Sequence, residues 1–154
     1  MSRWALIAAI IIAEGAGAGR AVASPKVTTT DVNSARELRA GSTDVIAHDL
    51  AKKLATAACS DCRVDASVTK LVVEQTTEGT SVMADIHLTV TDEHGVIISM
   101  VSGQSRAVAR REKVATLRDE ALHGAISSAS PKITRVLATH KPAPKLDVTR
   151  FAIK

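Results

Sequence analysis

The clearest pattern along the chain is an alternation of apolar and polar residues between positions 82 and 91. The apolar members are Val82, Ala84, Ile86, Leu88 and Val90. A period of two residues predicts a strand that buries one face and leaves the other open. The intervening residues Asp85, His87 and Thr89 then lie together on the open face, and we expect them to contact a protein partner.

Segments of the same period lie on either side of this strand. Val64, Ala66 and Val68 alternate with polar residues, and the phase shifts near Leu71, which indicates a β-bulge or a stretch buried on both sides. Residues 92–95 predict a tight turn, and a third strand follows from Val96 to about position 108. Because the connections are short, the three strands are expected to be antiparallel neighbours.

Two helices flank the predicted strands. Over residues 43–58, apolar side chains recur at spacings of three and four, and Ser42 or Thr43 is placed to cap the first turn. A second apolar stripe covers roughly residues 111–139. Pro131 interrupts that stripe, so either the helix kinks there or another helix begins at the proline.

This order of elements predicts an α+β fold in which a three-stranded antiparallel meander packs against two helices in a two-layer sandwich (αβββα). We assign residues 43–140 to this single domain. Residues 24–42 are interpreted as a polar leader or linker, with at most a short strand at 27–32. Residues 141–154 form a tail containing proline and lysine, in which 146–153 either add an edge strand or stay unpaired.

The first 23 residues have the pattern of a secretory signal peptide. Arg3 precedes an apolar run from Trp4 to Ala13, and Ala21 and Ala23 fit the small-residue rule for cleavage after Ala23. A membrane-spanning helix needs about 20 apolar residues, and this run is shorter. A cleaved signal peptide is therefore favoured, and an uncleaved membrane anchor is the alternative. We therefore expect a periplasmic or secreted protein whose mature chain has no transmembrane segment.

Composition narrows the functions that such a domain can have. The chain is 45% hydrophobic and only 1% aromatic. Its two aromatic residues are Trp4, in the expected signal peptide, and Phe151, in the tail. Proteins that bind single-stranded nucleic acids use aromatic side chains on which the bases stack. The net charge of +4 is small and its charges are interspersed, whereas duplex binding shows a concentrated basic stripe. We therefore expect an aliphatic core and no nucleic-acid partner.

The meander resembles a known periplasmic module. The segment VDASVTKL at 64–71, the segment ADIHLTVTDEHGVIIS at 84–99 and Ser102-Gly103 are similar to the αβββα module of the curli secretion channel (CsgG-like) family. Lipoprotein activators of peptidoglycan synthases share that module. The similarity covers about residues 43–139 and implies a scaffold that assembles or binds in the cell envelope. The lipid-anchoring cysteine of the family is absent here, and we find no long amphipathic hairpins, so a pore-forming role is not carried over. The similarity involves only fold-determining positions, so it implies no catalytic residue.

The compact motif Cys59-Ser60-Asp61-Cys62 follows the first predicted helix. In an oxidising compartment two nearby thiols tend to pair, so a local structural disulfide is the favoured interpretation. A thioredoxin-type redox site has its first cysteine at a helix N-terminus, whereas these cysteines follow the C-terminus of the predicted helix. Two free thiols and a thiol–disulfide or metal-handling role remain as alternatives.

Other catalytic and metal chemistry has weak support in the sequence. Asp85, His87, Asp92 and His94 would form a metal site only if the hairpin twisted to bring them together, and we predict no metal and no cofactor. There is no G-x-S-x-G elbow and no glycine-rich phosphate loop. We therefore predict an exported envelope protein with a non-enzymatic binding or assembly role and no catalytic residue. A small secreted hydrolase is the second alternative, and the oligomeric state stays open.

Overall fold

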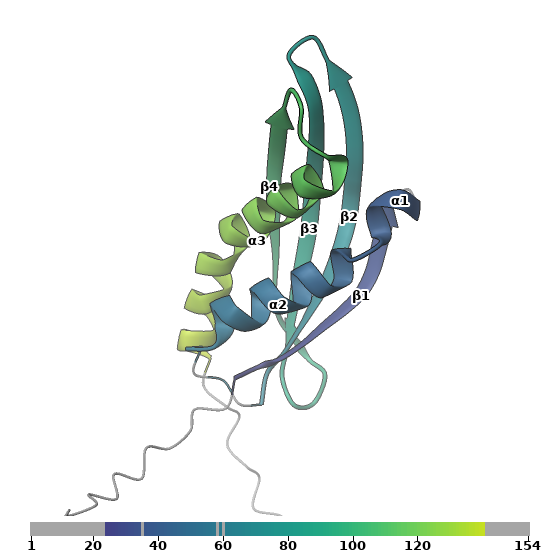
Figure 1. Cartoon of the computed structure of the whole chain (residues 1–154). Coiled ribbons are helices and arrows are strands. Elements are labelled where there is room, and N and C mark those ends of the chain that lie inside the picture. The colour runs from purple at the N-terminus through teal and green to yellow at the C-terminus, as the bar shows by residue number, and fades with distance from the viewer. Residues whose placement is uncertain (1–23, 35, 58, 60, 141–154) are drawn as a thin grey trace, which may run out of the picture.

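A computed structural model describes residues 24–34, 36–57, 59 and 61–140 (Figure 1). The expected signal peptide at 1–23 lies outside these residues. The possible edge strand at 146–153 also lies outside them.

Four strands form one mixed sheet in the order β1-β2-β3-β4. The strands β2 (Arg63–Thr76), β3 (Gly79–Thr91) and β4 (Ile97–Ala109) are antiparallel neighbours, as the alternation predicted. The fourth strand, β1 (Lys26–Ser34), pairs in parallel with β2 and makes the sheet mixed. It occupies residues that we had interpreted mainly as a polar leader.

The predicted phase shift in β2 is a bulge. The pairing with β3 steps from Val68 opposite Ile86 to Lys70 opposite Asp85, which leaves Thr69 as the extra residue. Leu71 then points into the core in place of Lys70. One strand therefore keeps a single buried face although its sequence changes phase.

Within residues 24–140, the described part of the chain contains three helices beside the sheet. The short α1 (Arg36–Arg39) precedes α2 (Ser42–Leu54), and the long α3 (Val114–Thr139) follows β4. The expected helix at 43–58 ends four residues early, at Leu54, where the chain turns toward the cysteines. The second helix is continuous, with an exposed Pro131 inside it.

Both long helices cover the same face of the sheet (Figure 1). Between the layers lies an aliphatic core that includes Ile46, Leu50, Ile86, Leu122 and Ile133, all 0% exposed. Aromatic side chains are absent from the buried residues of the described chain, in line with the composition. In this part of the chain, no helix combines the length and the apolar character that a membrane span requires.

Candidate functional site

The sheet face opposite the helices, here called the open face, carries the three residues singled out in the sequence. Asp85, His87 and Thr89 alternate along β3 with fully buried residues, so all three point away from the helix layer. His87 is exposed, and Asp85 and Thr89 are half-buried. No described element packs over this face, and the three side chains are therefore brought together on it.

Their neighbours on β4 give the open face a mixed character. Asp85 pairs with Gln104, and His87 pairs with Ser102. Thr89 pairs with Met100, whose side chain is 65% exposed. A methionine so exposed beside polar groups is typical of a surface that exchanges water for a partner.

Two features hold polar groups of the open face in place. Arg106 of β4 forms an ion pair and hydrogen bond with Glu74 of β2, so its side chain crosses over β3. Thr28 of β1 donates a hydrogen bond to the Asp65 carboxylate on β2. Such contacts between strands fix the positions of the side chains before any partner arrives.

Asp85 has an unusual environment on this face. Its Oδ1 atom is buried and has no hydrogen-bond partner among the described residues. A buried acceptor without a donor costs about 1–3 kcal/mol.

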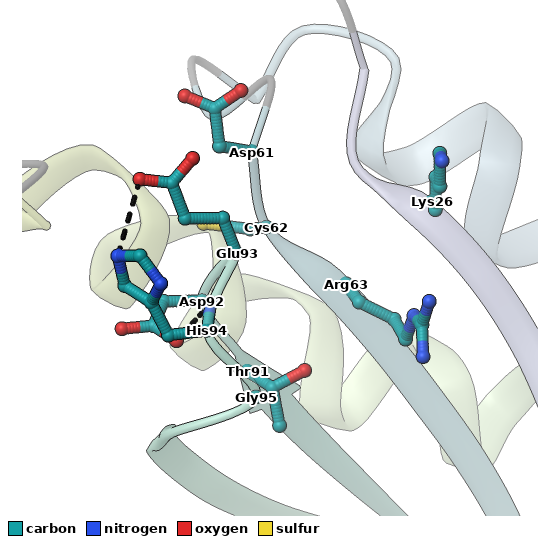
Figure 2. Close-up of a pocket in the computed structure, with 9 residues that line it drawn as sticks. All are labelled: Lys26, Asp61, Cys62, Arg63, Thr91, Asp92, Glu93, His94 and Gly95. Atoms are coloured by element: carbon teal, nitrogen blue, oxygen red, sulfur yellow. Dashed lines mark hydrogen bonds and ion pairs between the residues drawn. The ribbon is translucent and has the colours of Figure 1, made fainter.

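A pocket lies at the end of the sheet, around the β3–β4 turn (Figure 2). It has a volume of about 470 Å³. Its lining comes from the start of β1, the start of β2 with the preceding loop, and the turn. The lining residues are Lys26, Asp61, Cys62, Arg63, Thr91, Asp92, Glu93, His94 and Gly95.

The turn at this pocket is organised by Asp92. Its Oδ1 accepts hydrogen bonds from the backbone N–H groups of Val96 and His94, both at 2.9 Å. The hydrogen bond from the Val96 N–H is the largest cause that holds the pKa of Asp92 below its ordinary value, and the bond from His94 acts in the same direction. Gly95 has a φ of +79°, which a side chain would strain. The turn is therefore preformed.

Cys59 and Cys62 are joined by a disulfide between α2 and β2. Cys59 is 9% exposed and Cys62 is 2% exposed. The bridge closes the short loop that brings the chain from the helix layer into the sheet. Thiol exchange needs access to sulfur, and burial on this scale restricts it.

The histidines do not converge. Among the described residues, no group of three or more His, Cys, Asp or Glu side chains could hold a metal ion. Asp85 and His87 lie within the sheet, whereas Asp92 and His94 lie in the turn. His123 instead contacts Asp49 and ties α3 to α2.

Sequence reasoning missed two charged features. Lys26 and Arg63 come from different strands, and only the parallel pairing of β1 with β2 places them side by side. The other feature is Arg118, near the start of α3. It is buried to 8% exposure and donates to the carbonyl of Ala40 and to Asp119.

Comparison of the sequence with protein-family models and with curated proteins finds no match. Solved structures do match. A PelC variant dodecamer from Paraburkholderia phytofirmans has a TM-score of 0.50 at 11% identity, over 79% of this chain and 94% of that chain. A protein assigned as a lipoprotein from Caulobacter crescentus has a TM-score of 0.46 at 16% identity, over 76% of this chain and 93% of that chain.

A lipoprotein from Neisseria meningitidis has a TM-score of 0.37 at 10% identity, over 62% of this chain and 90% of that chain. At such low identities, a structural likeness shows the fold alone. The PelC match supports the expected α+β fold and does not single out the curli secretion channel family. The chain therefore shares its α+β fold with the PelC subunit.

Proposed function

We propose that the protein is exported to the cell envelope and binds a protein partner there, in a non-enzymatic role, through the open face of its sheet. The observation that carries this proposal is the one-sided placement of α2 and α3 (Figure 1). An antiparallel meander with one covered face leaves the other for solvent or a partner. The signal-peptide pattern of residues 1–23 supports export to the envelope.

The chemistry of the open face fits a protein partner. Exposed Met100 supplies an adaptable apolar contact next to Thr89. His87 and Ser102 line a shallow hollow beside it with a volume of about 160 Å³. Apolar contact surrounded by polar groups is the usual anatomy of a protein interface.

The test is capture of envelope proteins by the full chain and by matched variants. His87→Ala and Thr89→Lys alter the open face, and His48→Ala and Thr116→Lys make the same changes at exposed positions of the helix layer. We expect the open-face variants to lose a partner that the helix-layer variants retain. Equal capture by all four variants would refute the assignment of this face.

A second copy of the chain is an alternative occupant of the open face. The PelC matches are described as dodecamers. Sedimentation of the purified protein distinguishes this outcome, because a self-interface gives a mass that Thr89→Lys reduces to that of a monomer. A monomeric protein that still captures a partner supports a separate protein.

Burial of the disulfide supports a structural role for Cys59 and Cys62 rather than thiol–disulfide exchange. Mass spectrometry of the native protein with an alkylating agent tests this. We expect no alkylation before unfolding and reduction. Ready labelling of the folded protein would favour the thiol-handling alternative. No described feature favours the hydrolase alternative.

A further inference from the structure

The pocket at the end of the sheet lies apart from Asp85, His87 and Met100, the residues that carry the proposed partner surface. Its volume of about 470 Å³ lies in the size range of small-molecule sites, roughly 300–1,000 Å³. Its lining is dominated by charged residues of both signs, unlike the apolar lining of most ligand pockets. The arrangement of these charges indicates what the pocket can hold.

One wall of the pocket is basic. Lys26 pairs with Arg63 across β1 and β2, and Arg63 pairs with Thr91 across β2 and β3. The three side chains therefore share one face of the sheet, with two cations next to a hydroxyl group. Within the described residues, neither cationic side chain has an ion pair. A guanidinium, an ammonium and a hydroxyl group are suitable donors for a carboxylate.

The other wall is acidic. Asp61 comes from the loop closed by the disulfide, and Glu93 comes from the turn. Figure 2 shows these two carboxylates on the side of the pocket away from Lys26 and Arg63. Glu93 lies 3.4 Å from His94, and its side chain is 46% exposed, so it remains accessible. Asp92 is already engaged by backbone N–H groups and shapes the turn instead.

The pocket therefore has a positive side and a negative side. A simple anion would be attracted by Lys26 and Arg63 but repelled by the carboxylates. A simple cation would be attracted by the carboxylates but repelled by Lys26 and Arg63. A ligand that carries both charges at its two ends is favoured at both walls. We infer that this pocket binds a small zwitterion, an amino acid or a short peptide, with its carboxylate at Arg63 and Lys26 and its ammonium at Glu93.

The experiment titrates the full chain with triglycine and follows amide shifts by NMR. The comparison ligands are N-acetyl-triglycine, which lacks the ammonium group, and triglycine amide, which lacks the carboxylate. We expect saturable shifts at Thr91 and Gly95 with free triglycine. Each blocked peptide should bind about tenfold more weakly or worse, because it loses a charge-assisted contact.

Paired changes of ligand and protein locate each end. Arg63→Gln should weaken free triglycine about tenfold but leave the affinity for triglycine amide unchanged. Glu93→Gln should weaken free triglycine and leave N-acetyl-triglycine unchanged. Arg110→Gln and Glu120→Gln remove exposed charges elsewhere and should have no effect.

Several results would overturn the inference. They are the absence of a saturable shift, equal affinity for the free and blocked peptides, and equal or tighter binding of inorganic phosphate or Ca²⁺. Circular dichroism of each variant shows whether the fold is retained. The ligand is a small molecule and the protein is isolated, so failure here leaves the proposed partner surface untouched, and the reverse also holds.

Discussion

Gly103 lies on β4 directly beneath α3, and its lack of a side chain allows the helix to approach the sheet. A Cβ atom built there would lie 2.1 Å from the carbonyl oxygen of Ala125 and 2.8 Å from Oγ of Ser128. Because Ala125 contributes a backbone atom of α3, neither the strand nor the helix can move aside for a side chain at position 103 without shifting the two layers apart. The close contact of the two layers thus depends on this residue.

We predict that Gly103→Ala destabilises the fold by about 3 kcal/mol, at the upper end of the usual cost of overpacking. Chemical denaturation followed by circular dichroism measures the change. Ser102→Ala, at the exposed neighbouring position on the opposite face, should change the free energy of unfolding by less than about 0.5 kcal/mol. An unaltered stability of Gly103→Ala would mean that α3 does not pack where the structure places it.

Asp92 should make the β3–β4 turn sensitive to acid. Its pKa in the folded chain is lowered from 3.8, so the unfolded chain binds a proton more readily than the folded one. The stabilisation is complete above the unfolded value and is lost as the pH falls through the folded pKa. NMR shifts of the His94 and Val96 amides should therefore titrate with a midpoint below 3.8, and those of Asp92→Asn should not. A midpoint at or above 3.8 would contradict the hydrogen bonding described.

At the scale of elements, Arg118 joins the start of α3 to the residues before α2. It donates to the Ala40 carbonyl and pairs with Asp119. Its side chain is 9% exposed, so the hydrogen bonds are largely protected from water. An arginine in this position orients the two helices relative to each other.

We expect Arg118→Gln to lower the free energy of unfolding by about 2 kcal/mol, the usual value of hydrogen bonds to a charged group. Arg135→Gln, on the exposed side of the same helix, is the matched control and should be nearly neutral. Thermal or urea unfolding measures both variants. Equal stabilities of the two variants would show that Arg118 does not hold the helices together.

The disulfide stabilises a second junction, that between α2 and β2. The cysteines are separated by three positions, so the closed loop is short. The chain-entropy model then gives a stabilisation of about 2 kcal/mol. Reduction should lower the free energy of unfolding by that amount without changing the far-ultraviolet circular dichroism spectrum. The double variant Cys59→Ala/Cys62→Ala should not respond to reductant. Global unfolding on reduction would show that the bridge does more than fix one loop.

Local patterns in the sequence predicted most elements, but for β1 they indicated only a possible short strand at 27–32 and not its parallel pairing. The meander and both long helices follow from apolar spacing, and the bulge follows from the phase shift before Leu71. The segment KVTTTDVNS of β1 has only two apolar residues, and its pairing with β2 is parallel and remote in sequence. Threonine favours a strand but gives no apolar period that would place one.

The same distinction holds for the candidate sites. The open face could be predicted from the sequence of β3 alone, because the alternation of apolar and polar residues places Asp85, His87 and Thr89 on one side of the strand. The end pocket needs segments from β1, β2, the disulfide loop and the turn, and no local pattern relates Lys26 to Glu93. Sites assembled from distant segments require the register of the sheet, which only the structure supplies.

For the whole molecule, the central claim is that the open face meets a partner while the helix layer faces away from it. A photo-crosslinking amino acid at position 87, in place of His87, tests this directly in living cells. We predict a discrete crosslinked adduct between this protein and its partner from position 87. We predict none from position 48, where His48 is exposed on α2. Adducts from position 48 alone, or from neither position, would contradict it.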